Sequence, residues 1–465
     1  MYTIPLVLLA AVALLAIAGI VSAAARSKRF AIIAALVLLA IIVIASILLF
    51  AGSANYTILG VIRIYPFSMV FVSLFAVLMM LIEVLSYGSS NFPSMQLLIV
   101  FAFFALLVVP SSTSLIAIFM GFELFSVMVT FLIIISGRQH IEAAVKFFVL
   151  SATSIALFSA ALALMLPYNG SMLLSPASTA QAIGSSLLVL ALVLFIAAMS
   201  FDTAMFPFNL WVPDVYEGAS ANVTAMIAGI GKKLAFVVLI EVLFVFFASS
   251  HAIYSPLLAV LSVLTMFYGN FAAMAQRKVR RLFAYSSISQ AGYIMIGIAA
   301  ATQYGIEASI VQIIAHAFMI IGAFALIMWL EASNIKNIDD YTGLASRSRF
   351  AAVSFTLIML SMAGIPPLLG FDGKLLLFSS AISANMLALA VLGIINSFLS
   401  IYYYGKLINA MFTHREHRRI AASVGAVAVV IVVLAVIIVL GIYPQPVIHA
   451  ASLASSSLFG LGSSP

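Results

Sequence analysis

Long apolar stretches of about 20 residues, nearly free of charge, follow one another along the whole chain. Lipid offers no partner for backbone N–H and C=O groups, so such stretches cross a membrane as helices or as strands of a closed barrel. The apolar runs are continuous rather than alternating, which favours helices. Because 65% of the residues are hydrophobic and only 7% are charged, a soluble globular protein is excluded. The sequence therefore predicts an all-α polytopic membrane protein.

The apolar runs predict about fourteen transmembrane helices. Their approximate bounds are 4–25, 30–50, 66–87, 95–110, 111–136, 141–166, 183–211, 219–248, 254–275, 283–301, 305–331, 350–382, 385–412 and 420–442. The first run lacks a basic segment before it and is longer than the apolar part of a signal peptide, so we expect a retained helix.

Basic residues gather in the loops that follow odd-numbered spans. These residues are Arg26, Lys28, Arg29, Arg138, Arg277, Lys278, Arg280, Arg281, Lys336, Arg347, Arg349, Arg415, Arg418 and Arg419, and Arg63 is the exception. Short cytoplasmic loops collect Lys and Arg, so both termini are predicted on the outer side of a cell membrane. The same pattern accounts for the net charge of +7, and no nucleic acid partner is needed to explain it.

Redox cofactors are not expected in this chain. It has no cysteine, which excludes disulfides, thiolate-held iron–sulfur clusters and cysteine-based zinc sites. It also has no dinucleotide-binding glycine fingerprint and no P-loop.

Ionisable residues fall within the predicted spans. They are Glu83, Glu123, Lys146, Asp202, Lys232, Lys233, Glu241, Asp372 and Lys374. An ionised group at the bilayer centre costs at least about 2.5 kcal/mol on insertion scales, so such groups usually face the bundle interior and mark ion or proton paths. Structural ion pairs, or positions near a membrane surface, are the alternative for any one of them. His316, Tyr285, Ser286 and Ser287 are placed to link charged groups, although a packing role explains His316 equally well.

Two spans are interrupted by proline. Pro207 and Pro213 lie in "FPFNLWVPDVYEGA", and Pro366 and Pro367 lie in "AGIPPLLGFDGKLLLF". Each break is fourth in a block of five spans, which predicts two inverted five-helix repeats, each with a broken helix. A proline kink that only adjusts helix shape is the alternative. The predicted divisions are 1–94 (three N-terminal helices), 95–250 and 251–412 (the two repeats), and 413–465 (a last helix and a short tail).

Several motifs, in order, resemble those of a known family. They are "GFELFS", "EAAVKFFVLSA", "FPFNLWVPDVYEGA", "RKVRRLFAYSSISQAGYIMIGI" and "GIPPLLGFDGKLLLF", and they span about 95 to 412. This combination resembles the antiporter-like proton-pumping membrane subunits of respiratory complex I, the NADH-quinone oxidoreductase. "PDVYEGA", and a lysine in the second broken helix, resemble the N-type subunit, with the M-type subunit as the alternative.

The resemblance implies a proton path through Glu123, Lys146, Lys232 and Lys374. The family's lysine in the first broken helix is here Asp202, and two family histidines are Asn209 and Gln290. Glu123 therefore cannot form the family's usual pair with that lysine. Either the two carboxylates share a proton, or each takes a lysine, Asp202 with Lys146 or Lys232; we favour the second arrangement. In a third interpretation the subunit has lost its own half-channel and only transmits strain.

By this resemblance the chain moves protons while a neighbouring subunit reduces quinone. No cofactor is expected in this chain; quinone and the redox centres belong to partner subunits, which include a neighbouring antiporter-like subunit, all within the lipid bilayer. The tyrosines of "IYYYGKLINAMF" (401–412) are expected to anchor a helix at the membrane interface. The alternatives are a subunit of a multisubunit cation/proton antiporter, of a membrane-bound hydrogenase or of a coenzyme F420-type dehydrogenase, an autonomous secondary transporter, and a purely structural subunit.

Overall fold

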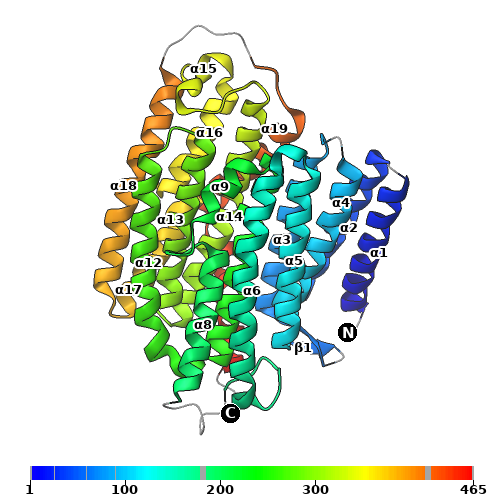
Figure 1. The fold of residues 1–465 in the computed structure, drawn as a ribbon, viewed down its shortest axis with the longest axis vertical. Coiled ribbons are helices and arrows are strands. Elements are labelled where there is room, and N and C mark those ends of the chain that lie inside the picture. The colour runs from blue at the N-terminus through cyan, green and yellow to red at the C-terminus, as the bar shows by residue number, and fades with distance from the viewer. Residues whose placement is uncertain are drawn as a thin grey trace. The chain divides into compact units, whose positions relative to one another are not determined.

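The computed structural model of the chain is almost entirely helical (Figure 1). It describes residues 3–25, 27–58, 60–89, 91–177, 185–413 and 420–462. Four of the arginines in the predicted loop pattern lie outside the described residues, namely Arg26, Arg415, Arg418 and Arg419.

The bounds of the helices and strands are as follows. In chain order they are α1 (Thr3–Ala25), α2 (Lys28–Ala51), β1 (Tyr56–Ile58), β2 (Ile62–Ile64), α3 (Pro66–Ser86), α4 (Phe92–Val108), α5 (Leu115–Ile135), α6 (Ile141–Asn169), α8 (Ser186–Thr203), α9 (Trp211–Gly218), α10 (Ala221–Met226), α11 (Lys232–Glu241), α12 (His251–Met274), α13 (Val279–Ala299), α14 (Gln303–Glu331), α15 (Leu344–Arg347), α16 (Arg349–Ala363), α17 (Leu369–Ser383), α18 (Leu387–Phe412), α19 (Val424–Ile442) and α20 (Gln445–Gly462).

Twelve helices of the described residues are long and apolar enough to cross a membrane, which confirms an all-α polytopic membrane protein. Two of the predicted spans are not among these twelve helices. The span predicted over 219–248 consists of α10 and α11 with the π-helical segments Ile227–Gly231 and Val242–Phe246, and the span predicted over 350–382 is divided into α16 and α17. The count of fourteen and the inverted relation of the repeats therefore stay predictions.

Helix α20 occupies most of the segment that was predicted as a short tail after the last span. Serines and a histidine lower the hydropathy of this segment below that of a membrane span. Ala451, Ala454 and Leu458 are nevertheless fully buried, and their spacing places them on one helical face. Burial of that face explains the helix.

The chain divides into two compact units. Unit 1 comprises Met1–Thr203, Ile230–Tyr254 and Ala450–Pro465, and unit 2 comprises Ala204–Gly229 and Ser255–His449.

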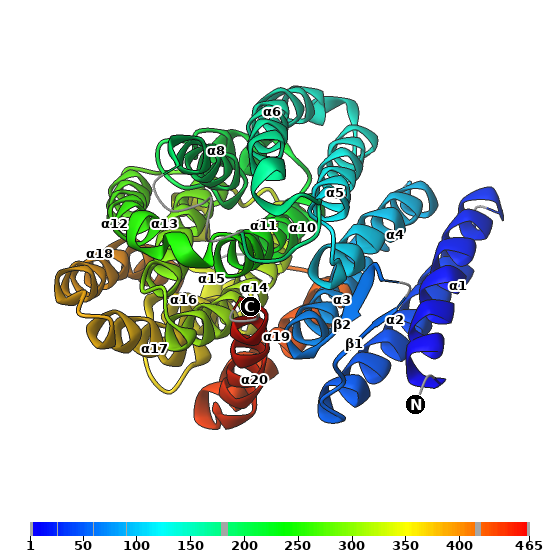
Figure 2. The same ribbon diagram turned by 90° about the horizontal axis from the view of Figure 1, so that it is seen from below.

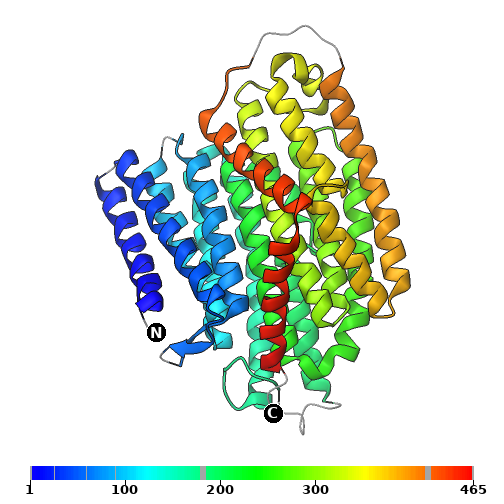
Figure 3. The ribbon, with the colours of Figure 1, turned by 180° about the vertical axis from the view of Figure 1, so that it is seen from behind.

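Unit 1 contains a series of helices packed on their neighbours. Helix α1 packs on α2, α4 on α5, α5 on α6, and α6 on α8, as Figure 2 shows. Strands β1 and β2 form an antiparallel hairpin after α2, with Tyr56 opposite Ile64 (Figure 3). Local signals set the helix starts, since Ser27 and Ser114 cap α2 and α5, and Pro66 occupies the first position of α3.

Unit 2 is organised around α14, which packs on α10, α13, α16, α17 and α19. Its apolar sequence is buried on all sides, as expected for a helix that is hydrophobic all round. The approach of α13 to α14 requires glycine, because a Cβ added at Gly297 would lie 2.3 Å from the Gly305 carbonyl oxygen.

The two proline-containing breaks are present as interruptions of helical structure. Helix α8 ends at Thr203 and α9 begins at Trp211, so Pro207 lies between the helices, whereas Pro213 lies in the first turn of α9. Helix α16 ends at Ala363 and α17 begins at Leu369, so Pro366 and Pro367 both lie in the second break.

Candidate functional site

Two carboxylates lie close together in unit 1. Glu123 is on α5, and Asp202 is in the last turn of α8, within electrostatic reach of it. Ser154 of α6 donates a hydrogen bond to the Asp202 carboxylate, and its Oγ also lies 3.1 Å from the Ala198 carbonyl oxygen. Helix α6 thus supplies a hydroxyl to a site whose two acids come from its neighbours.

Two hydroxyls that are hydrogen-bonded to each other lie about one helical turn away from these acids. Ser126 of α5 and Ser151 of α6 are hydrogen-bonded with 2.6 Å between their oxygens. Because Ser126 follows Glu123 by three residues and Ser154 follows Ser151 by three, all four share one inter-helix seam. This polar seam consists of Glu123, Ser126, Ser151, Ser154 and Asp202.

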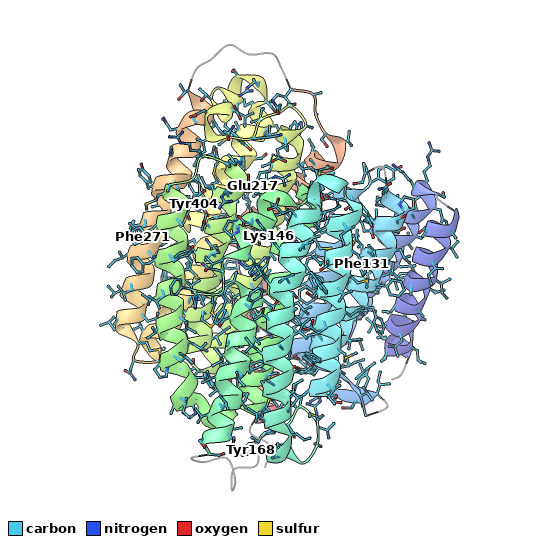
Figure 4. The ribbon with its side chains drawn as sticks, in the orientation of Figure 1. Phe131, Lys146, Tyr168, Glu217, Phe271 and Tyr404 are labelled. Carbon is cyan, nitrogen blue, oxygen red and sulfur yellow. The ribbon has the colours of Figure 1, made fainter. Side chains whose placement is uncertain are left out.

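Asp202 was expected to pair with Lys146 or Lys232, but its carboxylate accepts a hydrogen bond from Ser154. Lys146 forms an ion pair with Glu142 at 2.9 Å, one turn earlier on α6, with side chains 42% and 80% exposed; Figure 4 shows Lys146 on this helix. Helical side chains point back toward the N-terminus, and Lys146 lies about 12 Å before Ser154 along the axis. Lys146 therefore extends away from the level of Asp202, whose carboxylate accepts a hydrogen bond from Ser154 and lies within electrostatic reach of Glu123.

Lys232 and Lys233 occupy the start of α11 and are both almost completely buried. The π-helical segment Ile227–Gly231 comes directly before them, and such segments often occur at functional sites. Gly231 is needed here, because an added Cβ would lie 2.8 Å from the Phe125 ring. Helix α11 packs on α5 and α8, the helices that carry the two acids.

A buried carboxylate ends α11. The Tyr65 hydroxyl donates to Glu241 Oε1 at 3.0 Å, and Arg63 acts on the same pair electrostatically. Tyr65 is fixed at the start of α3, where its backbone N–H donates to Ser68 Oγ at 3.1 Å. Strand β2 and the start of α3 thus place Arg63 and Tyr65 near a carboxylate far away in sequence, an arrangement that sequence reasoning missed.

In unit 2, Lys374 lies beside the second break. Its Nζ donates to the Ala363 carbonyl at 3.0 Å and to Ser397 Oγ at 2.9 Å. The ammonium also lies 4.3 Å from the centre of the Tyr293 ring, in a cation–π contact. The end of α16, helix α13 and helix α18 therefore all contribute to the surroundings of this lysine.

The backbone of the break leaves room for the lysine stem. Gly364 has φ +87°, and an added Cβ there would lie 2.9 Å from Lys374 Cδ. Gly370 approaches the preceding helix, and its N–H donates to Ser361 Oγ at 3.2 Å. The broken helix thus places an amine where the regular i→i−4 hydrogen bonds have been interrupted.

Two glutamines and His316 extend the polar interior of unit 2. Gln312 donates to Gln290 at 2.9 Å, and Gln290 donates to the Met362 carbonyl at 2.9 Å. His316 is fully buried one turn after Gln312 on α14, so the two share a face. Gln290 therefore joins α14 to the end of α16.

The interface role expected for the tyrosines of α18 is wrong for two of them. Tyr402 is 63% exposed, but Tyr403 and Tyr404 are each only 1% exposed. The Tyr404 hydroxyl, labelled in Figure 4, hydrogen-bonds with Ser286 of α13. The polar environment inside the bundle explains this burial, since a buried tyrosine hydroxyl needs a hydrogen-bond partner.

The acids of "PDVYEGA" bind the basic start of α13. Arg281 contacts Asp214 at 3.0 Å and Glu217 at 3.1 Å, and Lys278 pairs with Glu217. Burial alone would raise the pKa of Glu217, but hydrogen bonds from Lys278 and Arg281 lower it below its usual value. This cluster fixes α9 against α13.

The residues predicted for the proton path thus divide between the units. Unit 1 holds Glu123, Lys146, Asp202 and Lys232, of which Glu123 and Asp202 are brought together, and unit 2 holds Lys374 and His316. Sequence reasoning missed the residues that connect charged groups, namely Ser126, Ser151, Ser154, Tyr65, Gln312, Asn270, Asn396 and Ser397. The sequence signal that could have identified these residues is the presence of single polar residues in otherwise apolar helices.

Comparisons with known proteins found related sequences and structures. Residues 112–400 match the family described as "NADH:quinone oxidoreductase/Mrp antiporter, TM". The F(420)H(2) dehydrogenase subunit N of Methanosarcina mazei is 34% identical over 379 residues, which cover 78% of this chain and 77% of that protein. The NADH-quinone oxidoreductase subunit N of Moorella thermoacetica is 34% identical over 421 residues, covering 87% and 88%. A chain of respiratory complex I from Thermus thermophilus is similar in structure, with a TM-score of 0.82 and 27% identity, covering 96% of this chain and 99% of that one.

Proposed function

Because the chain belongs to the family of NADH:quinone oxidoreductase/Mrp antiporter transmembrane proteins, we propose that it is the N-type proton-translocating membrane subunit of a complex I-type oxidoreductase. The observation that carries the proposal is the set of buried ionisable groups inside an apolar bundle, of which Asp202, Glu241 and Lys374 are hydrogen-bonded to polar partners. Lys374 at the second break, with hydrogen bonds to Ala363 and Ser397, is the clearest of them.

The proposed mechanism is electrostatic. In a low-dielectric interior the charged form of an acid or a lysine is disfavoured, and a nearby opposite charge restores it. A change in charge at the polar seam therefore alters proton binding at Lys232 in the same unit. Glu123 and Asp202 exchange protons through the hydroxyls of Ser154 and its neighbours, because a hydroxyl both donates and accepts.

The partner subunits follow from the same proposal. Electron transfer and quinone reduction take place in neighbouring chains, and this chain passes the resulting charge perturbation along its buried residues to a neighbouring antiporter-like subunit. Two features support redox centres outside this chain: the sequence has no cysteine, and the described residues include no group of three or more His, Asp or Glu side chains suited to a metal. We place both termini on the outer side of the cell membrane, on the basis of the loop charges.

A multisubunit cation/proton antiporter is the second candidate, because the matched family includes Mrp antiporters. Affinity purification of the full chain from mild detergent separates the candidates. We expect it to copurify with further antiporter-like subunits and with soluble chains that carry redox centres. Copurification with membrane subunits alone would favour the antiporter, and purification as a single chain would contradict both in favour of an autonomous transporter.

A further inference from the structure

One side of α17 is uncovered in unit 2. Helix α17 packs on α13, α14, α16, α18 and α19, and the side that carries Lys374 is buried by these contacts. The other side carries Asp372, Leu375, Ser379 and Ile382, whose spacing of three and four residues places them on one helical face. Leu375 is 49% and Ile382 51% exposed, and the two polar residues are partly exposed. We call these four residues the outer face of α17.

Asp372 of the outer face lies near the middle of its membrane span. It is about 16 Å along the helix axis from Ser383, where α17 ends. At that end the short turn 384–386 leads into α18, which is itself long and apolar enough to cross back, so this end lies at a membrane surface. The hydrocarbon core of a bilayer is about 30 Å thick. The carboxyl group is therefore placed about halfway across it.

The carboxyl group of Asp372 has no charged partner within the described part of the chain. Its Oδ2 has no hydrogen-bond donor there, and the one donor that reaches the group is its own backbone N–H. Lys374 lies on the buried side of the helix, where its Nζ donates to Ala363 and Ser397. Asp372 also lies in the first turn of α17, where the positive end of the helix dipole favours the ionised form. The outer face therefore carries a negative charge without an opposite one.

Neither lipid nor water suits this face. A charged side chain at the bilayer centre is costly, and such groups almost always face protein or a water-filled cavity. The break gives an independent argument, because Pro366 and Pro367 are exposed directly before α17, and non-helical backbone at this depth also needs protein or a water-filled cavity around it. Leu375 and Ile382 argue against a water-filled cavity, since exposure of apolar side chains to water is unfavourable. We therefore expect protein to cover the outer face.

The charge of the outer face indicates the chemistry of that protein. A second copy of this chain, related by a two-fold axis, would bring one Asp372 close to the other, and like charges repel. A membrane helix with a lysine or an arginine at the same depth would instead pair the carboxylate by charge-assisted hydrogen bonds. The apolar residues of the same helix would cover Leu375 and Ile382.

We propose that the outer face of α17 binds a membrane helix of a partner subunit, and that Asp372 forms an ion pair with a lysine or an arginine of that helix near the middle of the membrane. This inference rests on the proposed function, in which the chain is one subunit of a membrane assembly. It gives Asp372 a role in assembly, separate from the proton transfer proposed for Lys374 on the buried side of the same helix.

Photo-cross-linking from the outer face identifies the partner helix. In the full chain, within its native membrane, Leu375 is replaced by the photoreactive amino acid p-benzoyl-phenylalanine. After illumination the assembly is purified, and the cross-linked peptide is sequenced by mass spectrometry. We expect a peptide from a membrane helix of a copurifying subunit, with a lysine or an arginine inside its apolar stretch. Cross-links to lipid alone, or to a helix without such a basic residue, would overturn the inference.

Charge substitutions then test the ion pair itself. We expect Asp372→Asn to lower the amount of that subunit recovered with the chain by about tenfold, because the partner's basic residue loses its counter-ion. Asp372→Lys should lower the recovery further, and replacement of the partner's basic residue by aspartate should restore it in the Asp372→Lys background. Asp339→Asn is the matched control and should behave as wild type, since Asp339 is an exposed acid of the same unit outside the membrane helices.

The outcomes separate this inference from the proposed function. If the wild-type chain purifies with partner subunits, and both Asp372 variants recover them to the same extent, the ion pair is wrong and the proposed function stands. If the wild-type chain purifies without any partner, the proposed function itself is contradicted. If Asp372→Lys does not assemble and charge reversal in the partner does not restore it, the ion pair is also overturned.

Discussion

Replacement of Lys374 by methionine is expected to lower the rate of proton uptake by the reconstituted assembly about a hundredfold, because the only amine at the second break among the described residues is removed. Methionine has a similar length and fills a similar volume, so the cavity cost is small. The Ala363 carbonyl keeps a donor, since Ser397 Oγ already donates to it at 3.0 Å. The variant should therefore fold and assemble, and lose proton transfer specifically.

The measurement compares proton uptake and subunit content of the purified assembly. Lys406→Met is the matched control, because Lys406 is an exposed lysine of α18 in the same unit. We expect this control to retain wild-type uptake. Equal uptake in Lys374→Met and the wild type would show that no proton passes through Lys374.

Replacement of Asp202 by lysine introduces the residue that the resemblance implies at this position, yet we expect it to impair this protein. Lysine cannot accept the hydrogen bond that Ser154 now donates to the carboxylate. It would also form an opposite-charge pair with Glu123, which holds that acid ionised and prevents it from exchanging its proton. We expect the rate of proton uptake to fall by about tenfold.

Asp202→Asn separates the two effects of this substitution. Its amide oxygen still accepts from Ser154, but the side chain cannot exchange a proton. A loss in both variants would assign a proton-carrying role to Asp202, and a loss in the lysine variant alone would assign the effect to the new ion pair. Proton uptake at the wild-type rate in Asp202→Lys would show that Asp202 has no role in proton transfer.

The fold class could be predicted from the sequence because hydropathy and proline act locally. The apolar runs specify membrane helices, and Pro207, Pro366 and Pro367 lie where helical structure is interrupted. The number of spans was harder to predict, since the π-helical segments around α11 and the burial of α20 depend on packing with other helices.

The partners of the charged residues could not be predicted, because they come from distant parts of the chain. Asp202 meets Ser154, and Glu241 meets Tyr65, which is 176 residues away. Asp202 was expected to pair with Lys146 or Lys232, but Lys146 pairs with Glu142 one turn earlier, because helical side chains point back toward the N-terminus. Tyr403 and Tyr404 were assigned to the membrane interface because the sequence of a membrane helix does not show which of its faces lies inside the bundle.

We propose that this chain itself moves protons through its buried lysines. This proposal is tested most directly at Lys232. Proton uptake is measured in vesicles that contain the full assembly, with wild-type chain or with Lys232→Ala, at equal subunit content. Lys232 is buried beside the π-helical segment in unit 1. We expect proton uptake to be lost in Lys232→Ala, whereas uptake at the wild-type rate would show that this chain does not move protons through Lys232.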